Sequence, residues 1–89
     1  MTIETLEKIH ELLKNEVETR NNALELTQKA YNKRKDDLEE IAAAADDMKD
    51  ESVIAANRAV ETAKALYDEA WCQRKVAKDA LCDFESQDF

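Results

Sequence analysis

A heptad pattern of small and apolar residues runs through the second half of the chain and limits its fold more than any other feature. Alternating steps of three and four residues give the series Val53, Ala56, Val60, Ala63, Tyr67, Ala70, Arg74, Ala77, Leu81 and Phe84. This spacing is typical of a helix that buries one narrow stripe against another helix. Because alanine fills nearly every second position of the series, we expect the partner helix to come unusually close.

The first half of the chain carries a second stripe, which also keeps one heptad frame. Its apolar members are Ile3, Leu6, Leu13, Val17, Leu24, Tyr31, Leu38, Ile41, Ala45 and Met48. The same frame includes the polar residues His10, Arg20, Thr27 and Arg34. We therefore expect the middle of this helix either to be partly exposed to solvent or to pair its arginines with other side chains. Further apolar residues widen the stripe on one side, namely Ile9, Ala23, Ala30 and Ala44. A face this broad favours more than one neighbouring helix.

Residues 46–51 separate the two stripes and are rich in aspartate. Asp and Ser are poor interior helix residues because their side chains compete for nearby backbone groups, and Asp50 or Ser52 can cap a new helix. The heptad frame also restarts one residue late at Val53. A turn is favoured here, and the alternative is one continuous helix that absorbs a single-residue skip. At Asn21-Asn22, by contrast, the unbroken frame favours a continuous first helix.

The chain contains no Gly and no Pro, the residues that supply most tight turns, which argues against a sheet. We predict an all-α fold for residues 1–89, with a helix over about 3–45, a turn over about 46–51 and a helix over about 52–86. The two helices form a long antiparallel hairpin with a coiled-coil-like, alanine-rich seam. Facing residue numbers then sum to about 98, so that Tyr31 meets Tyr67, with Arg34 beside Ala63 and Arg20 beside Ala77.

This pairing leaves residues 1–11 without an intramolecular partner. The unpaired segment carries Ile3, Leu6 and Ile9, and Trp71 lies just beside the second stripe. Domains of this size are marginal on their own, so self-association into a dimeric helical bundle is the expected remedy. We predict that these four residues and Phe89 contact a second copy of the chain or another protein.

The net charge of −8 argues against binding to nucleic acid or to anionic membranes, both of which require a basic surface. Cys72 and Cys82 would lie roughly 15 Å apart on one helix, too far for a disulfide, so we expect reduced thiols packed as small apolar groups. Reduced thiols and the absence of a membrane-length apolar run or a signal-peptide pattern predict a cytoplasmic protein.

No catalytic or cofactor signature is complete. His10-Glu11 opens like a zinc-protease motif, but Lys14 stands where the second histidine is required. Glu7-x-x-His10 matches half of the carboxylate–histidine pattern of di-iron helical bundles, which a dimer could duplicate. We predict a protein that is not an enzyme, with no cofactor and no metal ligands.

The two ends of the chain carry a resemblance to known proteins. The N-terminal residues Thr2–Glu7 and the C-terminal residues Ala80–Phe89 resemble those of the short, acidic helical-hairpin proteins encoded in bacterial phage and mobile-element loci. The resemblance implies a genetic context, and it implies no activity and no site residues.

The function predicted from these features is structural or adaptor, exerted through helix–helix contacts with a second copy or a partner. One alternative is an acidic mimic of nucleic acid that inhibits a DNA-binding protein, which predicts carboxylates gathered on one exposed stripe. A second alternative is a carboxylate and histidine metal site assembled across a dimer.

Overall fold

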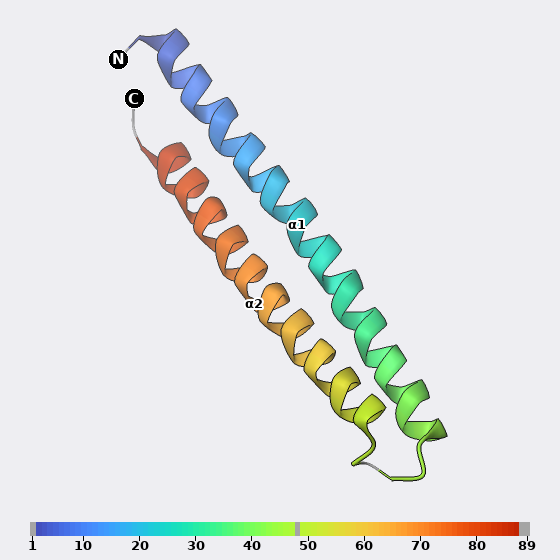
Figure 1. Ribbon diagram of the computed structural model, residues 1–89. Helices are drawn as coiled ribbons and strands as arrows, with labels where there is room; N and C mark the ends of the chain where they lie inside the picture. The colour runs from blue at the N-terminus through green and yellow to red at the C-terminus, as the bar shows by residue number, and fades with distance from the viewer. Residues whose placement is uncertain (1, 48, 88–89) are drawn as a thin grey trace.

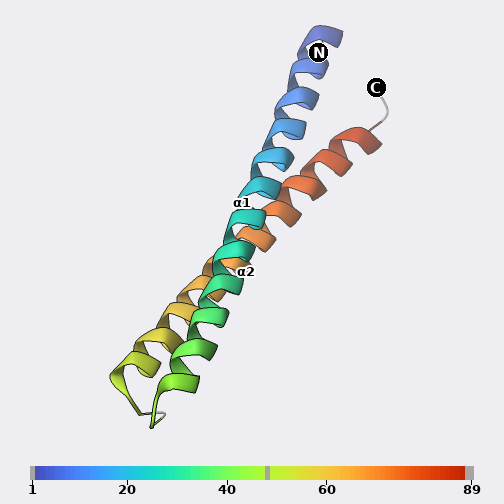
Figure 2. The same ribbon diagram turned by 90° about the vertical axis from the view of Figure 1, so that its right-hand side faces the viewer.

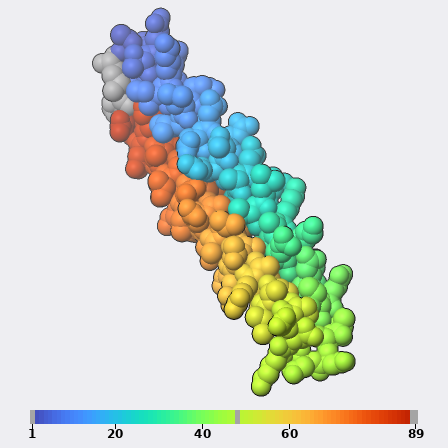
Figure 3. All heavy atoms as spheres, viewed as in Figure 1, coloured from blue at the N-terminus to red at the C-terminus, as the bar shows by residue number. Residues whose placement is uncertain are grey.

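The chain folds into two long antiparallel helices. A computed structural model describes residues 2–47 and 49–87 and contains α1 (Ile3–Ala44) and α2 (Glu51–Ser86). The helices lie side by side, a short turn joins them, and both ends of the chain lie at the opposite end from that turn (Figure 1). The predicted all-α hairpin is confirmed, and the alternative of one continuous helix is wrong. The Cα atoms span 67 × 14 × 14 Å, and the space-filling view shows an elongated rod (Figure 3).

Short polar side chains cap the helices and form the turn. The Thr2 hydroxyl accepts a hydrogen bond from the Thr5 backbone N–H at 3.2 Å, which satisfies one of the free donors at the start of α1. At the start of α2, the Asp50 carboxylate accepts from the Ser52 backbone N–H at 2.9 Å and from the Ser52 hydroxyl at 2.8 Å. The described residues contain no positive φ angle. The chain therefore reverses direction without glycine.

The cap at Asp50 gives one pH-dependent prediction. The hydrogen bonds from the Ser52 backbone and hydroxyl lower the pKa of Asp50 below its ordinary value. A lowered native pKa means that this stabilisation is complete above the unfolded pKa of about 4 and is lost as the pH falls below it. We expect Asp50→Asn, which keeps a capping oxygen at every pH, to lose less thermal stability than wild type between pH 4.5 and pH 2. Melting curves by circular dichroism at matched protein concentration test this, and equal losses in the two proteins would contradict it.

Among residues 2–47 and 49–87, the buried ones all lie on α2. They are Val53, Ala56, Ala63, Ala70 and Ala77, each exposed by 8% or less. None of the described residues of α1 is buried, and the larger side chains of α1 lie half-buried over this stripe. The heptad series thus predicts the buried residues of α2 correctly. Small residues on one helix facing large ones on the other are what close packing without voids requires.

Ring contacts between the helices fix their register. The Tyr31 and Tyr67 rings stack with centroids 6.0 Å apart, as the predicted pairing requires. Nearer the termini, the His10 ring stacks on Phe84 at 5.6 Å, and His10 Nε2 lies 3.1 Å from Glu85 Oε2. Seen from the side, the two helices cross at a shallow angle along their length (Figure 2).

The unpaired N-terminal segment is therefore shorter than the predicted residues 1–11. One-to-one pairing places His10 beyond the end of α2, whereas the structure brings it against Phe84. On a packed helix, each side chain fits between two side chains that lie one turn apart on the facing helix. A residue can therefore contact the facing helix up to one turn away from the position directly opposite it. The segment without an α2 partner therefore does not extend to His10.

Candidate association surface

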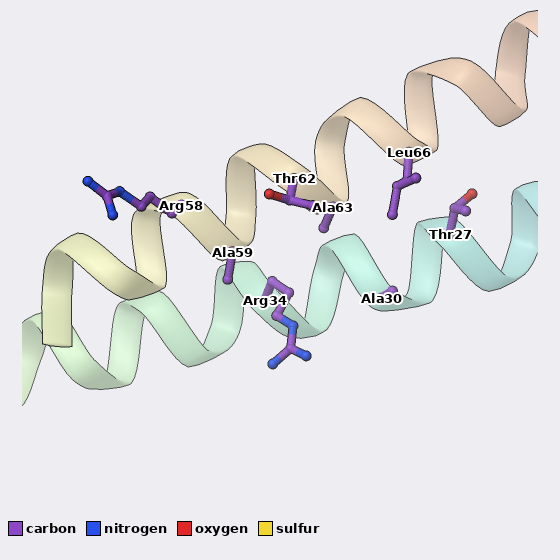
Figure 4. Close-up of a pocket in the computed structure, with 8 residues that line it drawn as sticks. All are labelled: Thr27, Ala30, Arg34, Arg58, Ala59, Thr62, Ala63 and Leu66. Carbon is purple, nitrogen blue, oxygen red and sulfur yellow. The ribbon is translucent and has the colours of Figure 1, made fainter.

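Two open grooves lie between α1 and α2. The groove nearer the turn, called here the turn groove, has a volume of about 420 Å³. Its lining residues are Thr27, Ala30 and Arg34 of α1 and Arg58, Ala59, Thr62, Ala63 and Leu66 of α2. In the close-up, Leu66 extends from α2 toward α1 near Thr27, and the two arginines lie at the end of the groove closer to the turn (Figure 4).

The second groove, called here the terminal groove, has a volume of about 380 Å³. Its lining residues are Leu13, Glu16 and Arg20 of α1 and Cys72, Gln73, Val76, Ala77 and Ala80 of α2. Every one of them lies fourteen positions from a residue of the turn groove; for example, Ala77 corresponds to Ala63 and Arg20 to Arg34. Fourteen residues are two heptads, so both grooves lie on the same side of the hairpin, called here the grooved face.

The turn groove exists because alanine occupies adjacent positions on both helices. Ala30 lies on α1, and Ala59 and Ala63 lie on α2, where a larger side chain would fill the space between the backbones. The sequence signal for this feature is the flanking row that includes Ala23 and Ala30, which makes the stripe of α1 broad. That row predicts an additional neighbouring helix, but the grooves also depend on Ala59 and Ala80 of α2, which the stripe of α2 does not include.

Large apolar side chains border the grooves and are exposed. Leu66 and Val76 line the grooves and are 53% and 69% exposed. Leu12 and Leu26 are each 68% exposed and stand one turn before Glu16 and Ala30, so they share the same side of α1. Exposed apolar residues gathered on one face, rather than scattered singly, mark a surface for contact with another protein.

The charges on the grooved face differ between its two ends. In the terminal groove, Arg20 Nε donates to Glu16 at 2.7 Å and Arg20 NH1 donates to Gln73 at 2.9 Å. In the turn groove, Arg34 lies 3.6 Å from Asp37, and Arg58 adds a second guanidinium. Of the two alternatives for the first stripe, a partly exposed middle or paired arginines, both hold: Arg20 and Arg34 are paired, and the Arg34 side chain is 53% exposed. The turn groove is the more basic of the two.

A stripe of carboxylates lies away from the grooves on α1. It consists of exposed glutamates at heptad spacing: Glu4, Glu11, Glu18, Glu25 and Glu39. The first four members lie roughly 10 Å apart, and Glu39 follows Glu25 after roughly 21 Å because Asn32 takes the position between them. Double-stranded DNA, by contrast, carries one charge per about 1.7 Å. Lys29 is also paired with Glu25 at 3.3 Å. A stripe this sparse and partly neutralised gives weak support to mimicry of nucleic acid.

The residues predicted for partner contact do not form one surface. Ile3 is 75% exposed, whereas Leu6 and Ile9 are half-buried near the termini. Trp71 is 47% exposed and stands five residues from both Leu66 and Val76, which places it roughly 140° around α2 from the grooved face. Phe89 and Met48 lie outside the described residues. The role of these residues in association stays a prediction.

The structure also locates the residues weighed for chemistry. Within residues 2–47 and 49–87, no three His, Cys, Asp or Glu side chains gather in a way that could hold a metal ion. His10, the histidine of the half motif, contacts Phe84 and Glu85. Cys72 and Cys82 are free and exposed, so the expectation that they pack as small apolar groups is wrong. In the heptad pattern both fall on positions that point away from α1.

Neither helix has a stretch long and apolar enough to cross a membrane within the described part of the chain. Comparisons with protein-family models, with curated protein sequences and with solved structures give no match to this chain.

Proposed function

We propose that this protein is a non-enzymatic structural or adaptor module that acts through helix–helix association, with a second copy of itself as the partner. One observation carries the proposal. The hairpin buries one valine and four alanines, while Leu12, Leu26, Leu66 and Val76 remain exposed on the grooved face. The larger apolar side chains are therefore left for contact with another molecule.

Burial energetics favour this function. Covering a Leu or Val side chain contributes roughly 1.5–3 kcal/mol, and alanine offers far less apolar area. A two-helix layer of this size has a small core and is marginally stable when alone. Covering the grooved face with further helices stabilises the fold and creates the interaction in a single step.

The free and exposed thiols of Cys72 and Cys82 support a reducing compartment, and we propose that the module works in the cytoplasm. An adaptor role would use the same surface, with one copy replaced by another protein that presents an amphipathic helix.

The mass of the protein in solution tests the proposal. The chain has a mass of 10.2 kDa, and we expect light scattering to give twice that value at micromolar concentration. The melting temperature is expected to rise with protein concentration, because association stabilises the folded state by mass action. A monomer whose melting temperature does not depend on concentration would refute self-association.

Leu6→Asp tests the N-terminal turns within the same experiment. Leu6 is half-buried near the start of α1, so a carboxylate there is expected to weaken the dimer if these turns contact the partner. A dimer that tolerates Leu6→Asp would exclude this segment from the interface and leave the grooved face as the contact surface.

A further inference from the structure

We infer that two copies associate face to face through their grooved faces and run antiparallel, with the two-fold axis at Ala23, so that the dimer is a four-helix bundle. This inference rests on the proposed self-association and adds the surface and the orientation. In this arrangement α1 lies over α1 of the partner copy, α2 lies over α2, and the two turns lie at opposite ends.

The length of α1 supports the position of the axis. Ala23 stands at the middle of α1 (Ile3–Ala44), so antiparallel stacking about it overlaps the two copies of α1 along their whole length. Ile3, which lies beyond the contact between His10 and Phe84, then rests near Ala43 and Ala44 of the partner copy. Alanine near the turn offers a small apolar surface to this exposed side chain. Ala23 itself permits close approach at the axis.

The repeat of the two grooves supports the antiparallel orientation. Because the grooves have equivalent lining positions two heptads apart, an antiparallel stack about Ala23 places the α1 lining of each turn groove over the α1 lining of the partner's terminal groove, with Ala30 opposite Glu16. Ala23 is level with Gln73 of α2. Leu66 of one copy therefore lies opposite Ala80 of its partner, and the same contact recurs on the other side of the axis. Such an interface is isologous and closed, so it ends at a dimer.

Charge distinguishes the antiparallel stack from a parallel one. A parallel stack places turn groove over turn groove and brings Arg34 and Arg58 of both copies together, which like-charge repulsion opposes. The antiparallel stack separates the two turn grooves and places Arg34 near Leu13 in the terminal groove of the partner copy. There the guanidinium of Arg20 is already hydrogen-bonded to Glu16 and Gln73.

The area of the face is sufficient for a stable dimer. The hairpin measures 67 Å by 14 Å between Cα atoms. A face of these dimensions is of the order of the ~800 Å² per partner found in standard protein interfaces.

Cross-linking tests the orientation. The natural thiols are first removed with Cys72→Ser and Cys82→Ser, both at exposed positions, and Ala23→Cys is then added. A short bis-maleimide is expected to convert most of this variant to a covalent dimer, because the two copies of residue 23 meet at the axis. Asn22→Cys is the control, since it lies on the same helix and points away from the grooved face.

Cross-linking in a mixture of two variants, each with one introduced cysteine, would detect the parallel stack. There α1 lies over α2 of the partner copy, so Ala23→Cys mixed with Gln73→Cys would give the cross-linked heterodimer, and Ala23→Cys alone would not react with itself. That result in a protein of dimeric mass would overturn the inference and leave self-association intact. A monomeric mass for the wild-type protein would instead refute the proposed function.

Discussion

Ala56→Glu is expected to unfold most of the hairpin at room temperature. Ala56 is 8% exposed and lies where α2 meets α1, so a glutamate there must bury its carboxylate or push the helices apart. The α1 residues that face it in the confirmed register are Leu38 and Ile41, which offer no positive charge. An unpaired buried charge costs about 3 kcal/mol or more, a large part of the stability of a domain this small. Loss of the helical circular dichroism signal measures this effect.

A matched control separates the effect of burying the new glutamate from the effect of adding a glutamate to the chain. Ala65→Glu gives a chain of identical composition with the new side chain at an exposed position of the same helix, and it is expected to melt within about 0.5 kcal/mol of wild type. Ala56→Leu adds volume without charge, and overpacking of this kind costs about 1–3 kcal/mol. If Ala56→Glu were as stable as Ala65→Glu, α2 would not pack on α1 through its alanines.

The sensitivity of Ala56 was predictable because burial in a long helix follows from periodicity. The heptad series in α2 includes all five buried residues, and the frame shift near Val53 predicts where the chain turns. The stacking of Tyr31 on Tyr67 follows from the position of that turn, since an antiparallel hairpin has one register for each turn. Caps at Thr2 and Asp50 follow from the chemistry of short polar side chains.

The features that sequence reasoning missed depend on how side chains from two helices interlock. Pairing by residue number places one residue opposite another, and so it left His10 unpartnered, whereas the structure packs it on Phe84. The heptad positions of Cys72 and Cys82 do not face α1 and so predict exposed thiols. The prediction of buried thiols relied instead on the general preference of cysteine for burial, and it was wrong. The grooves arise where Ala30 faces Ala59 and Ala63, which requires both helices at once.

Val76→Glu is expected to weaken the dimer about 100-fold without disturbing the hairpin. Val76 is 69% exposed within one chain, and glutamate favours helix more than valine does, so the fold of the single hairpin is unaffected. Val76 stands three residues from Gln73, which is level with the two-fold axis, so the two new carboxylates would be buried in the antiparallel interface close to each other. An effect of about 3 kcal/mol corresponds to this change in Kd, which sedimentation equilibrium measures. Asn57→Glu is the control, because it adds the same charge at an exposed position of α2 that stands five residues from Thr62 and so lies roughly 140° from the grooved face. Equal affinities for the two variants would show that the grooved face is not the interface.

A charge pair across the interface then tests which residues meet. Leu66→Lys alone is expected to weaken the dimer as Val76→Glu does, because it also places an unpaired charge in the interface. Ala80→Glu places the opposite charge at the facing position, in the terminal groove. A mixture of Leu66→Lys with Ala80→Glu is expected to recover a heterodimer, since Lys at position 66 of one copy meets Glu at position 80 of the other, while the second Leu66–Ala80 contact stays intact. Recovery requires that these two positions face each other. In a parallel stack each would face α1 of the partner copy, and the mixture would remain as weakly associated as its components.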